Sequence, residues 1–307
     1  MKGQDLWWHL AAGRLMLERR EIVRTEPWAF TREGAPWLNH EWLADVLYAA
    51  WAAAFGVESL AFWMLGIVTT TYVLLFALLR RLTGSPLASY AAALAALVLA
   101  RPVFEIRPHL YTLLGLVLTL WLAWLRPRPF VALPVLFLVW ANLHSGFVLG
   151  LGLLAVALVA RPGGGHGDQV MSWRAAGLSW AACALATLVN PYGVKMLLFP
   201  FGYARGDSPF RGLREWLSPF SEHALAVPWY RPALVVFAVV AIAGLWSGRW
   251  RQRSPLGWPA LAWGAGTAAM SAISVRFVPY FGLGLALTAA PVLADWLARF
   301  RRRRHGR

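Results

Sequence analysis

The first residues that could carry out chemistry are an acid and a base close to the start of the chain. Asp5 and His9 are four positions apart in Asp5-Leu-Trp-Trp-His9, so they share one face if this segment is helical. Such a pair could hold a metal ion or accept a proton. In a simpler interpretation, Asp5 caps the start of an interfacial helix and His9 lies among the lipid headgroups. The sequence allows both interpretations.

A second group of polar residues directly precedes a helical run from Leu43 to Ala54. Asn39, His40 and Glu41 are consecutive there. His40 and Glu41 are candidates for acid–base chemistry, whereas Asn39 or His40 could equally cap the helix. The segment lacks the second histidine of a metallopeptidase motif, because position 44 is alanine.

A third group is Glu105-Ile-Arg107-Pro-His109, which brings a carboxyl group, a guanidinium and an imidazole close together. Arg107 suits phosphate, because its planar fork can donate two parallel hydrogen bonds to an oxyanion. The alternative is a surface ion pair between Glu105 and Arg107, which would contribute little energy.

Polar residues also interrupt the apolar part of the chain. Asn142 and His144 stand between two short apolar runs, and we expect them to line a wet cavity instead of facing lipid. Glu215 lies in a long loop, and Arg276 directly precedes the last apolar run. An arginine at the mouth of apolar helices needs a partner, and a lipid phosphate would serve as well as Glu215.

The composition around these residues is that of a membrane protein. Hydrophobic residues make up 59% of the 307 residues and charged residues 14%, unlike a soluble domain. The 19 tryptophans and 8 tyrosines suit the interface between hydrocarbon and water. The net charge of +15 does not indicate nucleic-acid binding, because the arginines punctuate apolar runs instead of forming a polar surface. The single cysteine, Cys183, excludes a disulfide framework within the chain.

The hydropathy pattern predicts an all-α, polytopic transmembrane bundle of about nine spans. The apolar runs lie at 57–79, 86–100, 109–125, 130–142, 147–160, 175–189, 231–247, 256–273 and 278–297. The runs beside Asn142 to Gly146 are short against the roughly 20 residues that cross a bilayer, so they could form a re-entrant hairpin.

The chain divides into three parts. Residues 1–56 mix tryptophans with charges, which predicts interfacial amphipathic helices. Residues 57–298 form the transmembrane domain, with a long loop at 190–230, and residues 299–307 form a basic tail.

Alternate loops differ strongly in their content of basic residues. One set, with the tail, contains Arg80, Arg81, Arg126, Arg128, Arg161, Arg174, Arg249, Arg251, Arg253, Arg299, Arg301, Arg302, Arg303, Arg304 and Arg307. The short loops of the other set contain only Arg101, Arg107 and Arg276. The excess of arginine assigns the first set to the cytoplasm, so all the candidate residues share the extracytoplasmic side. An odd number of spans then starts Met1 outside, and we expect one more helix upstream of it in the natural reading frame.

The order of these motifs resembles the GT-C superfamily of multispanning glycosyltransferases, in an uncharacterised bacterial branch. The similarity covers most of the chain. It rests on Asp5-Leu-Trp-Trp-His-Leu with Gly13, Asn39-His-Glu-Trp-Leu43, Arg107-Pro-His, Trp140-Ala-Asn-Leu-His-Ser-Gly146, Asn190-Pro-Tyr-Gly193 and Glu215-Trp216.

The resemblance implies an enzyme of the bacterial cytoplasmic membrane that moves a sugar from a polyprenyl-phosphate donor to an extracytoplasmic acceptor. Asp5 takes the position of the acidic residue that acts as a base or helps to hold a divalent metal, and His9 could share such a metal. Leu6 stands where a second acidic residue would be, which weakens the case for a metal-binding acidic pair.

The resemblance also assigns roles to the remaining candidates. His40 and Glu41 join Asp5 as catalytic candidates, and Arg107 and Arg276 would stabilise the leaving phosphate. The residues expected to bind substrate or phosphate are Glu105, Arg107, His109, Asn142, His144, Glu215 and Arg276. The apolar helices would accommodate the lipid tail.

A secondary transporter or lipid-handling protein could be built from the same materials. However, the sequence contains no pair of similarly interrupted halves, and its polar groups gather toward one face. Alternating access needs a site that both sides can reach. These observations favour an enzyme, with a noncatalytic scaffold subunit as a third alternative.

Overall fold

The computed structural model describes residues 5–125, 131–160, 172–204, 213–251 and 256–305. Within these residues the secondary structure is entirely helical apart from turns and one isolated bridge between Thr25 and Pro36. The prediction of an all-α fold is confirmed.

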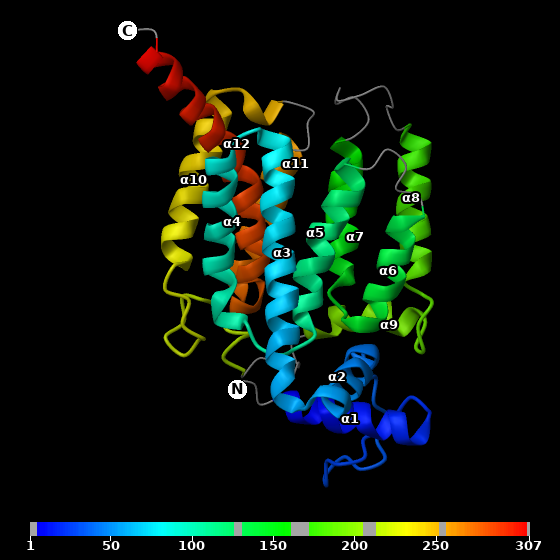
Figure 1. The fold of residues 1–307 in the computed structure, drawn as a ribbon. Coiled ribbons are helices and arrows are strands. Elements are labelled where there is room, and N and C mark those ends of the chain that lie inside the picture. The colour runs from blue at the N-terminus through cyan, green and yellow to red at the C-terminus, as the bar shows by residue number, and fades with distance from the viewer. Residues whose placement is uncertain (1–4, 126–130, 161–171, 205–212, 252–255, 306–307) are drawn as a thin grey trace.

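Two helices, α1 (Leu6–Arg19) and α2 (Trp42–Phe55), lie across the lower end of the molecule in Figure 1. They pack closely because Gly13 has no side chain. A Cβ atom at this position would overlap the backbone oxygen of Asp45 and come within 2.7 Å of the Ala49 Cβ. These helices correspond to the segment for which we predicted short helices, and they are transverse to the rest of the fold.

Nine further helices of the described chain coincide with the nine predicted apolar runs. They are α3 (Leu60–Thr83), α4 (Pro86–Ala100), α5 (His109–Leu125), α6 (Ala132–Leu143), α7 (Phe147–Ala160), α8 (Trp173–Ala186), α10 (Tyr230–Trp246), α11 (Trp258–Ile273) and α12 (Val278–His305). In Figure 1 they run roughly along one axis, and α12 packs against α4 and α11. The short helix α9 (Val194–Leu198) lies in a connection at the end that faces α1 and α2.

Three helical segments of the described chain are long and apolar enough to cross a bilayer. They are Val57–Thr83, Pro86–Val103 and Val275–Arg303, each including a short 3-10 turn. These segments indicate a membrane protein. The other six helices of the bundle have 12 to 17 residues, fewer than the roughly 20 that a perpendicular crossing needs. Nine complete spans therefore remain a prediction.

Trp140 holds the centre of the bundle together. Its side chain is buried, and its ring lies against Gly115 of α5 and Gly150 of α7. Side chains at these two glycines would collide with the indole, so the glycines allow three helices to meet around one large ring. This packing fixes the turn after α6, which carries His144.

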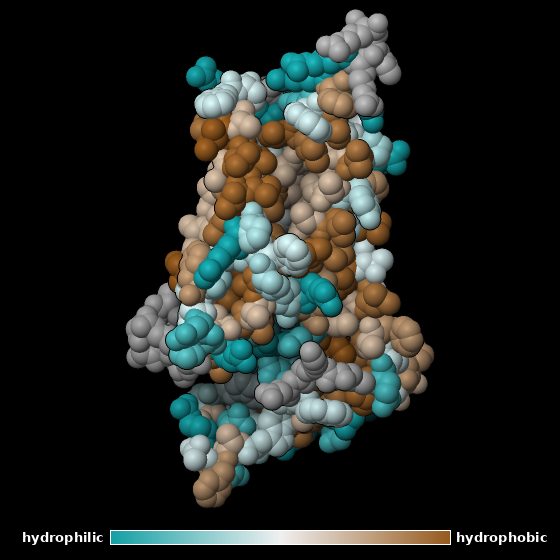
Figure 2. Space-filling model, turned by 90° about the vertical axis from the view of Figure 1, so that its left-hand side faces the viewer, coloured by the Kyte–Doolittle hydropathy of each residue, from teal (hydrophilic) through white to brown (hydrophobic). Residues whose placement is uncertain are grey.

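The two ends of the bundle differ in charge. The end away from α1 and α2 carries Arg80 and Arg81 of α3, Arg174 of α8, Arg249 and Arg251 of the turn η5 (Arg249–Arg251), and the arginines that end α12. Arg126, Arg128, Arg161 and Arg253 lie outside the described residues. In Figure 2, hydrophobic residues cover much of the upper half of the visible face, and hydrophilic residues gather at its top and in its lower half.

Candidate functional site

The candidate residues gather at the end of the bundle that faces α1 and α2, in two neighbouring groups. We call the first the arginine cluster, which consists of Arg107, Arg276, Glu215 and Asp5. We call the second the imidazole cluster, which consists of Glu41 with His9, His40 and His144. Each group joins residues that are far apart in the sequence.

In the arginine cluster, a single carboxylate lies between two guanidinium groups. Arg107 donates from Nη1 to Glu215 Oε2 at 2.8 Å and from Nη2 to Oε1 at 3.3 Å. Arg276 donates from Nη1 to the same Oε1 at 2.8 Å. Burial tends to raise the pKa of Glu215, but the hydrogen bonds from Arg107 and the charges of both arginines lower it overall. Glu215 is therefore an anion at neutral pH.

The backbone around Glu215 is fixed to the start of α12. The backbone N–H of Arg276 donates to the Glu215 carbonyl at 2.9 Å, and the Ser274 hydroxyl donates to the same oxygen at 3.0 Å. The N–H of Val275 donates to the Leu217 carbonyl at 3.0 Å. This pairing explains why a residue of the long loop and a residue at a helix start meet.

Asp5 joins the arginine cluster from α1. Its Oδ2 lies 2.6 Å from Arg107 Nη2, and it makes no capping hydrogen bond although it precedes α1. Glu105 is more distant from Arg107, at 3.8 Å. The local sequence suggested that Asp5 caps a helix and that Arg107 pairs with Glu105. In the structure, Asp5 and Arg107 instead make their closest contact with each other, across the fold.

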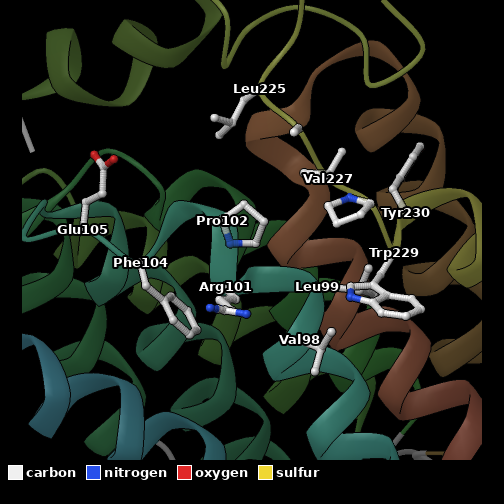
Figure 3. A pocket seen from close by; sticks show the side chains of 12 residues that line it. Val98, Leu99, Arg101, Pro102, Phe104, Glu105, Leu225, Val227, Trp229 and Tyr230 are labelled. Atoms are coloured by element: carbon white, nitrogen blue, oxygen red, sulfur yellow. The ribbon is translucent and has the colours of Figure 1, made fainter. Parts of the chain in front are cut away.

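Two adjacent cavities lie beside the arginine cluster. The smaller one, of about 30 Å³, is lined by Arg107, His109, Glu215 and Arg276 among others. The larger one, of about 560 Å³, has a mostly apolar wall and is lined by Val98, Leu99, Arg101, Pro102, Phe104, Glu105, Leu225, Ala226, Val227, Pro228, Trp229 and Tyr230. Pro102, Glu105 and Leu225 line both. Figure 3 shows Glu105 at one edge of the larger cavity, with Leu99 and Trp229 well away from it.

In the imidazole cluster, three histidines surround the carboxylate of Glu41. Its Oε1 lies 3.5 Å from His144 Nε2 and 3.6 Å from His40 Nε2, and its Oε2 lies 3.9 Å from His9 Nε2. Glu41 is buried at the N-terminal end of α2, and Asn39 Oδ1 accepts a hydrogen bond from its backbone N–H at 3.1 Å. Three separate parts of the sequence, at His9, at His40 and Glu41, and at His144, meet here only in the folded chain.

Asp45 was not among the residues that the sequence indicated, yet it makes the shortest contact of this region. Its Oδ1 lies 2.6 Å from His9 Nδ1, and its Oδ2 accepts a hydrogen bond from Asn39 Nδ2 at 2.8 Å. The sequence did contain an indication of this role, because Asp45 is the only charged residue in α2 and lies four positions after Glu41. An ionisable residue within an apolar helix is therefore a candidate site residue even where it belongs to no motif.

The pKa values in this cluster move in opposite directions. Burial raises the pKa of Asp45 to about 6. Burial tends to lower the pKa of His9, but its hydrogen bond with Asp45 and the charges of Glu41 and Asp45 raise it overall. Burial tends to raise the pKa of Glu41, but the three imidazoles and Arg276 lower it to about 2. Glu41 is a carboxylate at neutral pH, and the His9–Asp45 pair holds a proton beside it.

The remaining candidates make contacts within the protein. Asn142 accepts a hydrogen bond from Trp42 Nε1 at 3.0 Å and donates to the carbonyls of Leu138 and Val189, so it joins α2 to α6 and to the segment after α8. His109 Nε2 bonds the Val103 carbonyl at 2.7 Å. Both residues therefore position the polar end of the bundle.

The described residues contain no group of three or more histidine, cysteine, aspartate or glutamate side chains arranged to hold a metal ion. Asp5 and His9, the suggested pair of ligands, have different partners, Arg107 and Asp45. The described residues therefore do not fit a metal ion at this pair.

A comparison of the chain with protein-family models, curated proteins and solved structures found no match. Membership of the GT-C superfamily is therefore a proposal that rests on the motifs alone.

Proposed function

We propose that the chain is an integral membrane glycosyltransferase that moves a sugar from a polyprenyl-phosphate donor to an acceptor on the extracytoplasmic side. The observation that carries the proposal is the convergence of Arg107 and Arg276 on one anion, beside a mostly apolar cavity. A donor of this class has a phosphate next to a long apolar chain. Its two halves match these two neighbouring environments.

Arg107 and Arg276 are suited to the phosphate of the donor. Both point at the same small volume, and the bidentate contact that Arg107 makes with Glu215 is one that a phosphate can also make. In the proposed reaction, the bond between the anomeric carbon and the phosphate oxygen breaks, and its electron pair leaves on the phosphate. Two fixed cations stabilise that developing charge in surroundings partly closed to water.

The larger cavity suits the first part of the lipid chain. Its wall contains Leu99, Phe104, Val227 and Trp229, and Trp229 is exposed at the surface of the bundle. The rest of a polyprenyl chain would continue into the bilayer, where its apolar surface needs no protein partner. We propose that the larger cavity is the entry for the lipid.

Among the catalytic candidates, Glu41 is better placed than Asp5 to accept a proton. Asp5 is held by Arg107 at 2.6 Å, whereas the Glu41 oxygens lie 3.5 to 3.9 Å from the three imidazoles, which is longer than a close hydrogen bond. His40 lies beside Glu41, and burial lowers its pKa, so it is a neutral imidazole that can orient a ligand. Asp5 and His9 are one helical turn apart, and the His9 N–H donates to the Asp5 carbonyl at 3.2 Å, so the two clusters are neighbours.

The arginine-rich end of the bundle lies opposite both clusters, as Figure 1 shows. By the positive-inside rule that end faces the cytoplasm. We therefore propose that the site faces the extracytoplasmic side of a bacterial cytoplasmic membrane.

The test is transfer of a labelled sugar from polyprenyl phosphate by the purified protein in lipid vesicles. Arg107→Gln and Arg276→Gln are each expected to reduce kcat/KM by about 10²-fold or more, since each removes a donor to the leaving phosphate. The matched control is Arg14→Gln, because Arg14 is exposed on α1. If no donor supports transfer, or if both variants act like the control, the glycosyltransferase proposal is wrong and a transporter or scaffold becomes the better explanation.

A further inference from the structure

We propose that His144 and Glu41 form a binding site for a neutral hydroxyl group, and that Glu41 takes the proton of that hydroxyl. The site is adjacent to the arginine cluster but separate from it. The catalytic role of this site rests on the proposed glycosyl transfer. Its preference for a hydroxyl group does not depend on that proposal.

The first argument is that the surroundings of His144 fix the position of its ring proton. The backbone N–H of Gly146 donates to His144 Nδ1 at 2.9 Å, and this nitrogen also lies 2.7 Å from Thr112 Oγ1. A backbone N–H can only donate, so Nδ1 must be the acceptor. The proton of the neutral ring is then on Nε2.

The contacts that keep His144 Nδ1 as a hydrogen-bond acceptor come from residues that the fold holds in place. Thr112 Oγ1 accepts a hydrogen bond from the indole of the buried Trp140 at 3.3 Å, so the hydroxyl keeps its own hydrogen for His144. A side chain at Gly146 would collide with Thr112, so only glycine fits this turn. Together, these residues hold the imidazole in one orientation.

The second argument is that the resulting N–H has no hydrogen-bond partner. His144 Nε2 is buried and unpaired, and it points toward Glu41 Oε1 at a distance of 3.5 Å. A buried donor without a partner destabilises the fold, so a ligand oxygen placed there would relieve this cost. Burial also lowers the pKa of the His144 imidazole well below its usual value, so the ring stays neutral.

The third argument is that this pairing selects a class of ligand. Beside one fixed N–H donor stands one carboxylate, which accepts only. A hydroxyl can satisfy both, because it accepts from His144 and donates to Glu41. A phosphate or carboxylate ligand would be repelled by Glu41, and an ammonium group has no lone pair for His144. The site therefore suits the alcohol of a sugar or polyol acceptor.

The chemical step follows from this arrangement. The acceptor oxygen forms a bond to the anomeric carbon of the donor while its proton passes to Glu41. The bond from that carbon to the phosphate oxygen breaks, and the electron pair leaves on the phosphate held by Arg107 and Arg276. His9 lies 3.9 Å from the other oxygen of Glu41 and is oriented by Asp45, so it is a positioning residue for the Glu41 carboxylate.

The first experiment uses selectively ¹⁵N-labelled histidine in the full chain and needs no catalytic activity. The nitrogen shifts of His144 are expected to report the Nε2–H form. Glycerol, a neutral polyol, is expected to shift the Nε2 signal, whereas inorganic phosphate and ammonium are expected to leave it in place. The exposed residue His223 serves as the internal control. The Nδ1–H form in the free protein, or a response to phosphate equal to that to glycerol, would overturn the proposal.

The second experiment compares variants in the transfer assay. Glu41→Gln is expected to lower kcat by about 10²–10⁴-fold, the range usual for a general base, with unchanged binding of the polyprenyl-phosphate donor. His144→Gln should raise KM for the acceptor alone, and His223→Gln should change neither constant. Thermal unfolding shows whether a variant is folded. If a variant is misfolded, the ¹⁵N spectra of the unaltered protein test the proposal instead. Undiminished transfer by a folded Glu41→Gln protein contradicts the proposal, whereas lost donor binding in the arginine variants bears only on the proposed function.

Discussion

Replacing Glu215 with glutamine separates a structural role of the two arginines from a role in binding phosphate. The carboxylate accepts hydrogen bonds of 2.8 and 3.3 Å from Arg107 and one of 2.8 Å from Arg276. Glutamine keeps the shape of the side chain but removes its charge. The two guanidinium groups then lack their shared counter-ion, and an external anion no longer competes with an internal one.

The magnitude follows from the number and exposure of these contacts. Breaking a buried ion pair costs about 3–5 kcal/mol. The side chains here are 20 to 25% exposed, so solvent screens part of the interaction. Because glutamine also retains one acceptor, we expect about 1.5–3 kcal/mol of lost stability, the value of hydrogen bonds to charged groups. Removing the competing carboxylate should tighten binding of a lipid phosphate by a similar free energy, which is roughly 10- to 100-fold in Kd.

The assay is binding of a fluorescent polyprenyl phosphate to the protein in nanodiscs, with thermal unfolding measured on the same samples. Glu58→Gln is the matched control, since Glu58 is exposed at the start of the first long apolar helix. Lower stability together with tighter lipid binding is expected only for Glu215→Gln. If stability falls while lipid binding weakens or stays the same, the arginines are structural partners of Glu215, and the reasoning about a phosphate site is refuted.

Three further predictions concern α1 and α2. Gly13→Ala should destabilise the fold by about 1–3 kcal/mol because its Cβ would overlap the backbone of Asp45, whereas Gly177→Ala, which meets open space in α8, should be neutral or stabilising in the same unfolding assay. The pKa of Glu41 is lowered from 4.5 to about 2, so its charge contributes stability above pH 4.5 that is lost as the pH falls toward 2. Over that window Glu41→Gln should lose about 3 kcal/mol less stability than the unaltered protein on acid titration, and equal losses would mean that folding does not lower the pKa of Glu41. Asp5→Asn should retain sugar transfer within about 10-fold, because its carboxylate is engaged by Arg107, and a loss of about 10²-fold or more would identify Asp5 as the base.

The sequence predicted the helices of the bundle well. Each of the nine apolar runs coincides with a helix, and α1 and α2 formed in the segment expected to contain short helices. Hydropathy and turn residues are local properties, so they can be read from neighbours along the chain. The hydropathy pattern did not fix the lengths, since six of the helices have 12 to 17 residues, and only their packing determines how they lie.

The sequence also identified most of the polar residues that meet at one end. Arg107, Glu215, Arg276, Glu41 and His144 were all candidates because ionisable residues are costly beside apolar runs. It did not indicate which of them are partners. Arg107 is 108 positions from Glu215, and a nearer carboxylate, Glu105, competed for the assignment.

By itself, the sequence determined that this protein is helical and apolar, and that its polar side chains fall between apolar runs. Only the tertiary structure decided that Glu215 lies between two arginines, that Asp45 orients His9, and that Gly146 sets the proton of His144. The physical reason is the range of the interactions. Hydropathy acts on consecutive residues, whereas a hydrogen bond or an ion pair depends on distances of about 3 Å between atoms that only the packed fold brings together.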